Sequence, residues 1–304
     1  MSREPPPIPA DWLAWVSRLR ADGGPDGATW ARGLPRRLTD VLADWDLEPT
    51  GEPVRTGWTA VVVPVRRQGA AAMLKLLWPH REALGEHLAL RRWAGEGAVR
   101  LLAADPARHC LLLERLDADR DLTGLDTDQA CAVIGGLLRR LHVPALPRLV
   151  RLDDVVRDEL GELDREPGSL PRRVVDQTRA LFRDLDGDPA STATLVHTDL
   201  HDGNVLAGER EPWLAIDPKP MAGHPGFEVE PILRNRAQEY RHAPSIRRGV
   251  RRRFEIVCES AGLDRSLARE WTIVHATVDA FRAARDGERD QVGLFIAILK
   301  ALEE

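Results

Sequence analysis

The 304-residue sequence predicts an α+β protein with two lobes, because its predicted strands lie mainly in the first half and its amphipathic helices in the second. Between Val54 and Leu116, short aliphatic and β-branched runs alternate with turns, which is typical of an antiparallel sheet. From Asp126 onward, apolar residues recur at helical spacing, interrupted by a stretch rich in polar residues at 195–218. A chain of this length can bury a core in each lobe.

Residues 1–50 are expected to form a helical extension ahead of the sheet. Asp11 is a candidate N-cap for a helix ending near Arg20, and Pro35 is a candidate first-turn residue of a second helix ending near Trp45. Large aromatic side chains usually serve packing, and we interpret the tryptophans of this segment in that way: Trp12, Trp15, Trp30 and Trp45. No chemistry is predicted for the extension.

Lys75 is unusual in the predicted sheet. It lies within the apolar run 71–77, where an unpaired cation is costly, and it is one of only three lysines among 43 basic residues. A lysine on an edge strand could reach water, whereas a lysine held by a carboxylate could bind nucleotide phosphates. The helix expected over residues 80–93 carries two candidate partners, Glu82 and Glu86. We favour Glu86, because the helix dipole already explains a glutamate in the first turn.

Two further parts of the sheet are candidates for nucleotide contacts. The turn before the first long strand contains Gly57 and Thr59, and its backbone N–H groups could face phosphate. An ordinary turn is the alternative, since no glycine-rich phosphate motif is present. The last strand ends near Glu114 and Leu116, ahead of a polar break at 117–121. If this is the crossing between the lobes, its backbone contacts adenine; a plain strand end is the alternative.

A kinase-like spacing of polar residues marks the centre of the sequence. Asn204 lies five residues after Asp199, and Asp217 lies thirteen residues after Asn204. One carboxylate can orient an attacking hydroxyl or accept its proton, while an amide and a second carboxylate can hold Mg²⁺. A hairpin through residues 208–212 is expected to bring Asp217 back beside Asn204. The pattern predicts phosphoryl transfer from a nucleoside triphosphate.

Two histidines flank Asp199. We interpret His197 as a scaffold that hydrogen-bonds the loop backbone, and His201 as either loop support or a contact to the transferring phosphate. The order His-x-Asp-x-His could instead supply the metal ligands of a hydrolase, but the spacing of Asn204 and Asp217 is then unexplained. A non-catalytic nucleotide-binding module is disfavoured because the residues for chemistry are all present. A protein kinase is disfavoured because no D-F-G or A-P-E motif occurs.

The composition limits the partners. The net charge is −5, so nothing favours nucleic acid, and a cationic small molecule is weakly attracted. The N-terminus has no apolar signal segment, and no apolar run reaches about 18 residues. We therefore expect a cytoplasmic protein without membrane contact. The three cysteines are far apart and are interpreted as core thiols.

Two segments of the chain, Val196–Leu206 and Trp213–Pro220, carry a family resemblance. Their sequences, VHTDLHDGNVL and WLAIDPKP, resemble the aminoglycoside phosphotransferase family. The run EREPW at 209–213 and the run LKLLWP at 74–79 resemble its streptomycin 6-phosphotransferase and hydroxyurea phosphotransferase branch. The resemblance covers roughly residues 10–300. It departs from the family pattern at His224 and Glu228, where related sequences often carry Asp.

This resemblance implies a protein-kinase-like fold, with an antiparallel sheet lobe that carries one key helix and a larger, mainly helical C-terminal lobe. It implies Asp199 as the catalytic base, Asn204 and Asp217 as Mg²⁺ ligands, and ATP or GTP as the donor, with Lys75 on its phosphates. The predicted domains are a helical extension (1–50), a nucleotide-binding β lobe (51–116) and a helical catalytic and acceptor-binding lobe (117–304).

The acceptor is expected to be a hydroxyl of streptomycin or a related aminoglycoside, with hydroxyurea or an unknown metabolite as alternatives. A polycationic sugar requires acidic residues, and the candidates in the helical lobe are Asp202, Glu228, Glu230, Glu239, Asp279 and Asp286. Lys219, two residues after Asp217, could contact phosphate or acceptor, or simply face water. Glu228 could also brace the catalytic loop. We expect a monomer.

Overall fold

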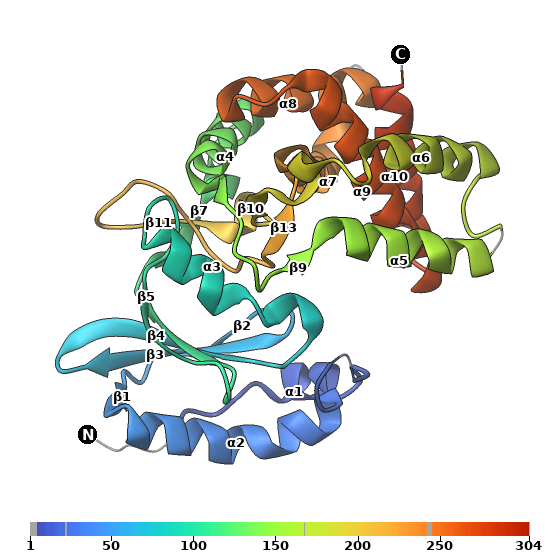
Figure 1. The fold of residues 1–304 in the computed structure, drawn as a ribbon. Helices are drawn as coiled ribbons and strands as arrows, with labels where there is room; N and C mark the ends of the chain where they lie inside the picture. Colours follow the sequence, from blue (N-terminus) through green and yellow to red (C-terminus); the bar gives the residue numbers. More distant parts are fainter. Residues whose placement is uncertain (1–4, 22, 167, 242–244, 304) are drawn as a thin grey trace. The chain divides into compact units, whose positions relative to one another are not determined.

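The computed structural model describes residues 5–21, 23–166, 168–241 and 245–303 (Figure 1). The chain divides into two compact units, which are described separately. Unit 1 extends to Asp117 and includes Gly208–Arg210, and unit 2 comprises Ala118–Ala207 and the chain from Glu211 onward. The first contains an antiparallel sheet and the second is mainly helical, so the predicted α+β class is confirmed.

Unit 1 is built on one sheet with strand order β1-β3-β4-β6-β5, and β2 also pairs with β3. Every pair is antiparallel. The long central hairpin β3–β4 turns at Gln68 and Gly69, which both have positive φ. The strands are β1 (Leu47–Pro49), β2 (Arg55–Thr56), β3 (Ala60–Arg67), β4 (Ala70–Leu77), β5 (Leu101–Asp105) and β6 (Cys110–Glu114).

Alternation along β4 divides its side chains between the two faces of the sheet. Leu74 and Leu76 belong to a buried apolar core that they share with helices α1 (Ala10–Val16) and α2 (Gly27–Asp44). Lys75 points to the other face, on which the short helix α3 (Glu86–Trp93) lies (Figure 1). The strand period therefore presents Lys75 to α3 rather than to the core.

The predicted end of the first helix and the predicted start of the second were wrong, whereas the second helix does end at Asp44, next to Trp45. Asp11 lies in the first turn of α1, after Pro9 at its N-cap, and α1 ends at Val16. In α2 the cap is Asp26, whose side chain accepts a hydrogen bond from the Thr29 N–H at 2.7 Å, and Pro35 lies inside the helix. An interior proline costs about 3 kcal/mol, which the cap and the buried apolar stripe of α2 offset.

Two further boundaries differ from expectation. The helix expected over 80–93 is divided into a 3₁₀ turn, η1 (Arg81–Ala83), and α3. The polar segment Asp117–Asp121 is not a break but the strand β7, which pairs with β11 (Val205–Ala207). Its charged side chains are largely exposed, and a strand at the edge of a sheet tolerates them because only its backbone must be paired.

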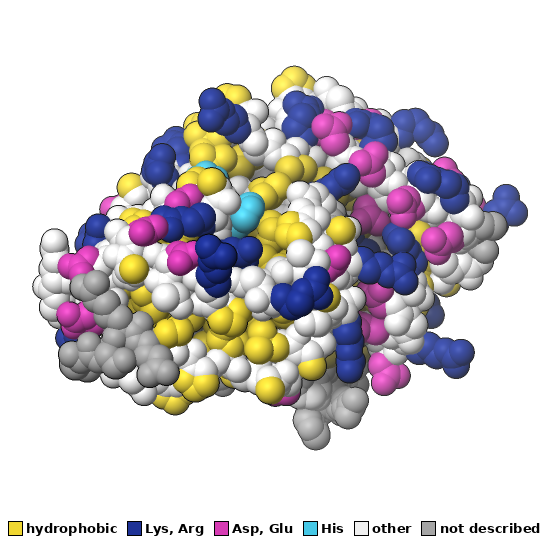
Figure 2. All heavy atoms as spheres, turned by 90° about the horizontal axis from the view of Figure 1, so that it is seen from below, with side chains coloured by type: hydrophobic (Ala, Val, Ile, Leu, Met, Phe, Trp, Pro, Cys, Tyr) yellow, Lys and Arg dark blue, Asp and Glu magenta, His cyan; other side chains and the backbone are white. Residues whose placement is uncertain are grey.

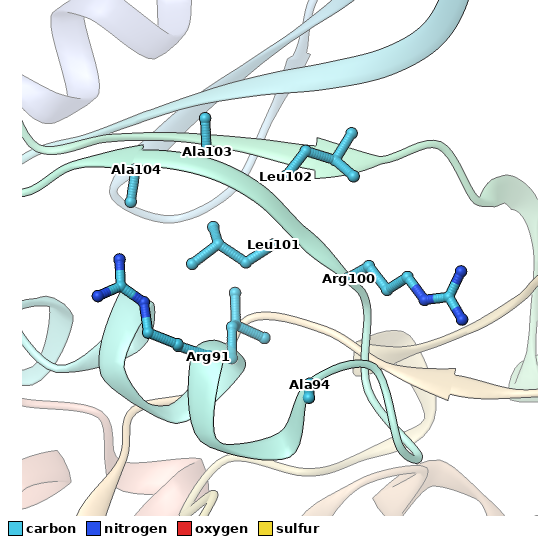
Figure 3. A pocket seen from close by; sticks show the side chains of 8 residues that line it. Arg91, Ala94, Arg100, Leu101, Leu102, Ala103 and Ala104 are labelled. Atoms are coloured by element: carbon cyan, nitrogen blue, oxygen red, sulfur yellow. The ribbon is translucent and has the colours of Figure 1, made fainter.

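A hollow of about 390 Å³ lies between α3 and β5 in unit 1 (Figure 3). Arg91 and Arg100 lie at its two ends with their guanidinium groups pointing away from its centre. The rest of its lining is aliphatic, so the hollow offers a ligand no converging polar groups. The lining residues are Leu90, Arg91, Ala94, Arg100, Leu101, Leu102, Ala103 and Ala104.

Unit 2 is organised around the long helix α9 (Arg265–Arg285), whose side chains are buried through most of its length. The other helices are α4 (Thr127–Leu141), α5 (Leu152–Arg165), α6 (Arg172–Leu185), α7 (Glu230–Arg234), α8 (Ile246–Ala261) and α10 (Arg289–Leu302). Short 3₁₀ turns connect them: η2 (Leu122–Gly124), η3 (Pro189–Thr192), η4 (Asp202–Asn204), η5 (Pro225–Val229) and η6 (Ala237–Arg241).

Two small sheets of unit 2 carry the polar segment at 195–218. The first has the order β8-β10-β13-β9, and in the second β11 lies between β12 and β7. The strands are β8 (Val143–Pro144), β9 (Val150–Arg151), β10 (Thr194–Val196), β12 (Leu214–Ala215) and β13 (Met221–Gly223). These ladders fix the ends of the loops that follow them, which is where the predicted catalytic residues lie.

The surface carries both signs of charge. Figure 2 shows Lys and Arg side chains interspersed with Asp and Glu on one face, without a continuous basic area there. Among the described residues, no helix combines the length and the hydropathy needed to cross a membrane.

Candidate active site

The loop that carries Asp199 leaves β10 and is held against the segment that enters β13. Val196 pairs with Met221 in this sheet. Beyond it, the Lys219 N–H donates to the His197 carbonyl at 3.0 Å, and the Thr198 hydroxyl donates to the Lys219 carbonyl at 2.6 Å. Thr198 has a φ of 61°, a left-handed conformation that is strained for a β-branched residue. These hydrogen bonds hold the strained turn, which directs the chain into Asp199.

The buried carboxylate of Glu228 also holds this turn. Oε1 of Glu228 accepts hydrogen bonds from the backbone N–H groups of His197 at 2.5 Å and Thr198 at 3.1 Å. Its Oε2 contacts Nε2 of His142 at 2.5 Å. Because Glu228 is fully buried and its carboxylate is committed to the protein, we assign it to loop bracing and not to acceptor contact.

The two flanking histidines support the loop. Burial lowers the pKa of His197, so its ring is neutral: Nδ1 accepts from the Asp199 N–H at 3.3 Å and Nε2 donates to the Ile216 carbonyl at 3.0 Å. Burial also lowers the pKa of His201, whose Nδ1 accepts from the Gly203 N–H at 3.1 Å. These contacts describe a scaffold, as expected for His197 and as one of the two alternatives for His201.

The predicted hairpin does bring Asp217 beside Asn204. Strands β11 and β12 pair antiparallel, and the Ile216 N–H donates to the Asn204 carbonyl at 2.9 Å. Asp217 follows with a φ of 56°, which turns the chain sharply after the strand. Nδ2 of Asn204 donates to the Asp199 carbonyl at 2.8 Å, which fixes the amide plane of Asn204. The three predicted residues therefore lie together on two adjoining loops.

Two cations flank the carboxylate of Asp199. Nζ of Lys219 lies 3.0 Å from Oδ2, and Nη2 of Arg234 lies 3.2 Å from Oδ1. Nδ2 of Asn204 is also 3.5 Å from Oδ2. Lys219 was predicted to contact phosphate or acceptor, or to face water; the structure instead pairs it with Asp199. Sequence reasoning missed Arg234, because nothing near it in the chain pointed to Asp199.

Two of the remaining acidic candidates, Asp202 and Glu230, are buried beside arginines. Glu239 and Asp279 are half-buried, and Asp286 is exposed. Asp202 lies 3.5 Å from Nε of Arg236; burial raises the pKa of Asp202, and the neighbouring arginine opposes that shift. Glu230 is fully buried, and its Oε2 accepts from Nε of Arg234 at 3.1 Å. In this structure both carboxylates have a basic partner from the protein itself.

In unit 1, Lys75 is paired with Glu86, as favoured. Its Nζ lies 2.8 Å from Oε1 and 2.9 Å from Oε2, and both side chains are almost fully buried. The argument that led to Glu86 was wrong in one respect, because Glu86 is itself in the first turn of α3. The side chain of Glu82 lies outside the described residues.

The turn that contains Gly57 and Thr59 is held by tryptophans of α1. The indole N–H of Trp12 donates to the Gly57 carbonyl at 2.8 Å, and that of Trp15 donates to the Trp58 carbonyl at 3.2 Å. Oγ1 of Thr59 lies 3.0 Å from Nε2 of His80. The N-terminal extension therefore does more than fill space, since it fixes the turn that was predicted to cover phosphate.

Replacing Trp12 by phenylalanine tests this link. The variant loses the hydrogen bond to Gly57, so we expect a loss of about 1 kcal/mol in stability and a KM for the predicted nucleotide raised about threefold to tenfold. Trp30 is the matched control: it is a core tryptophan whose indole nitrogen has no hydrogen-bond partner within the described residues. Trp30→Phe should change stability but leave the ATP KM unchanged. Equal KM values for the two variants contradict the link.

The end of β6 is fixed by an arginine of the same unit. The carboxylate of Glu114 accepts from the Arg100 N–H at 2.7 Å and from Nε and Nη2 of Arg210 at 3.0 and 2.7 Å. Leu116 follows the strand and is half-buried. The side chain of Glu114 thus holds the end of the strand, and the Glu114 N–H donates to the Arg100 carbonyl at 3.0 Å. The predicted adenine contact would therefore use the rest of the backbone at Glu114 and Leu116.

The fold is that of known small-molecule kinases. A crystal structure of the aminoglycoside phosphotransferase APH(4)-Ia with ADP and hygromycin B aligns with a TM-score of 0.58 at 14% identity, covering 86% of this chain and 97% of that one. Choline kinase LicA from Streptococcus pneumoniae aligns with a TM-score of 0.56 at 12% identity, covering 88% and 98%. The predicted protein-kinase-like fold is therefore confirmed.

Sequence comparison gives the family. The model of the aminoglycoside/hydroxyurea antibiotic resistance kinase family matches residues 44–287, and the chain belongs to this family. It is 43% identical over 292 residues to a hydroxyurea phosphotransferase of Kitasatospora aureofaciens, covering 92% of this chain and 81% of that protein. It is 41% identical over 271 residues to a streptomycin 6-kinase of Streptomyces glaucescens, covering 87% of each. The chain is therefore a phosphotransferase with a hydroxyl acceptor.

Proposed function

We propose that this enzyme transfers the γ-phosphate of ATP to the 6-hydroxyl of streptomycin and so confers resistance to that antibiotic. The observation that carries the proposal is the placement of Asp199 beside Asn204 and Asp217, which supports kinase chemistry. The acceptor is taken from the streptomycin 6-kinase relatives, at 41% and 39% identity. Hydroxyurea is the second candidate, favoured by the relative at 43% identity.

In this proposal Asp199 orients the acceptor hydroxyl and accepts its proton. Phosphoryl transfer through a loose transition state depends mainly on positioning and charge neutralisation. A carboxylate held in place by Lys219 and Arg234 can therefore act as the general base without being a strong base. His197, His201 and Glu228 act on the loop that presents it, and not on the substrate.

Asn204 and Asp217 suit Mg²⁺. Because Nδ2 of Asn204 is committed to the Asp199 carbonyl, its Oδ1 is the atom turned away and available as a ligand. Mg²⁺ prefers such oxygen ligands and takes only one or two carboxylates from the protein, which Asp217 supplies. When bound, the ion neutralises charge on the nucleotide phosphates.

On unit 1, we assign Lys75 to the nucleotide phosphates, with Glu86 holding its ammonium group in place. The turn at Gly57 and Thr59 covers the phosphates, and the backbone at Glu114 and Leu116 contacts adenine; GTP is the alternative donor. The ion pair supports this assignment, since a buried lysine held by a glutamate keeps its charge.

A coupled assay for ADP release tests the function. Parallel reactions contain streptomycin, hydroxyurea, other aminoglycosides or simple sugars, with ATP or GTP and Mg²⁺, and phosphorus NMR identifies the product. We expect the highest kcat/KM with streptomycin and loss of turnover when a chelator removes Mg²⁺. Turnover with hydroxyurea but with no aminoglycoside selects the second candidate. If no acceptor increases ADP release, the proposed acceptor class is wrong.

A further inference from the structure

Asp199 has a cationic neighbour, Arg234, that the sequence did not predict. Nη2 of Arg234 donates to Oδ1 of Asp199 at 3.2 Å, while Nε of the same guanidinium donates to Oε2 of Glu230 at 3.1 Å. Arg234 ends the short helix α7, and Glu230 begins it one turn earlier. One planar group therefore bridges the catalytic loop and a fully buried carboxylate.

The anchoring side of this bridge is built deep into unit 2. Oδ2 of Asp279, on α9, lies 3.9 Å from Nε of Arg234. One turn earlier on α9, Nδ1 of His275 donates to the Phe227 carbonyl at 2.7 Å, and the rings of these two residues stack 3.6 Å apart. These contacts hold η5 and α7 against α9, so the helix that carries Arg234 is rigidly positioned.

The charges of the cluster match a guanidinium and not a metal ion. Glu230, His275 and Asp279 place ligand atoms within 4.8 Å of one another, a spacing that a metal could use. The guanidinium of Arg234 already lies against both carboxylates, however, and a metal would have to displace it. Burial lowers the pKa of His275 to about 4, so its ring adds no positive charge at neutral pH. Arg234 supplies the charge that these buried acids require.

We propose that Arg234 is a positioning residue for Asp199. Anchored on Glu230 and Asp279, Arg234 holds Oδ1 of Asp199, so that the acceptor hydroxyl approaches the Asp199 carboxylate from the side away from Arg234. This inference rests on the proposed kinase function. Lys219 cannot replace it, because an ammonium group is a point charge, whereas the fork of Arg234 fixes direction by bonding two carboxylates at once.

Steady-state kinetics of Arg234→Ala, Arg234→Met and Arg234→Lys test the proposal. We expect the alanine and methionine variants to lose about 10- to 100-fold in kcat, because a misdirected catalytic group costs that much, while the ATP KM stays within about twofold. Lysine should recover only part of the loss. Since the side chain of Arg234 is about one-third exposed, added guanidinium ion should restore activity to the alanine variant at concentrations that leave the parent unaffected.

Arg282→Ala is the matched control. Nη1 of Arg282 lies 3.7 Å from Oδ1 of Asp279, and its Nε donates to Oε1 of Glu159 at 2.9 Å. It therefore touches the same acidic cluster, whereas the cations placed against Asp199 are Lys219 and Arg234. We expect the kcat of Arg282→Ala to equal that of the parent enzyme. Parental kcat in Arg234→Ala, or an equal loss in Arg282→Ala, overturns the proposal, because the effect is then absent or belongs to the cluster as a whole.

A double-mutant cycle on stability separates this inference from the proposed function. The melting temperatures of Asp199→Ala, Arg234→Ala and the double variant are compared with that of the parent. Non-additive shifts demonstrate the Asp199–Arg234 coupling even if no acceptor is turned over, in which case only the proposed function fails. Additive shifts show that the two side chains are not coupled and reject the positioning role.

Discussion

Asp199→Ala is expected to lower kcat by about 100- to 10,000-fold, the range that a positioned proton acceptor contributes. The affinity for ATP should change little, because Asn204 and Asp217, the proposed metal ligands, remain in place on the β11–β12 hairpin. The side chain touches Lys219 and Arg234 in the structure and is proposed to touch the acceptor hydroxyl when substrate is bound. Coupled kinetics give kcat, and isothermal titration calorimetry gives the ATP affinity.

The structure offers a matched control for this substitution. Asp153 is also a buried carboxylate of unit 2, and its Oδ2 pairs with Nη2 of Arg151 at 2.6 Å. Asp153→Ala should reduce stability while leaving kcat unchanged, which separates a loss of catalysis from a loss of fold. A variant Asp199→Ala that turns over at the parental rate refutes the assigned role of Asp199. A variant that loses ATP affinity as strongly as kcat points to a metal ligand instead.

What the sequence could predict is local. A strand period of two places Lys75 on the face opposite the core, and two short apolar runs joined by a turn predict the β11–β12 hairpin. Both are consequences of geometry over ten to twenty residues, which periodicity and turn chemistry determine. For the same reason, the starts of α2 and α3 were placed wrongly: a cap at Asp26 and a break before Glu86 depend on packing that periodicity does not report.

The contacts that hold the site are between residues far apart in the chain. Arg234 is 35 residues from Asp199, His142 is 86 residues from Glu228, and Trp12 is 45 residues from Gly57. A sequence presents each of these as an ordinary arginine, histidine or tryptophan. Only the fold brings them to their partners, so a single sequence could suggest which residues perform chemistry but not which ones position them.

The second large effect is expected at the buried ion pair of unit 1. The side chains of Lys75 and Glu86 are only 6% and 2% exposed. Removing one partner leaves a buried charge without its counter-ion, which typically costs about 3–5 kcal/mol. Lys75→Met and Glu86→Leu should therefore each lower the free energy of unfolding by about that amount, as measured by urea denaturation. Both should also lower kcat/KM for ATP.

The double variant Lys75→Met/Glu86→Leu distinguishes the fold from the function. Replacing both partners by apolar side chains of similar size is often neutral for stability, so most of the lost unfolding free energy should return. Activity should not return, because the ammonium group proposed to bind the nucleotide phosphates is still missing. If the double variant recovers kcat/KM for ATP together with stability, the pair has only a structural role and Lys75 does not bind phosphate. If neither stability nor kcat/KM recovers, the packing between β4 and α3 depends on the charged pair itself.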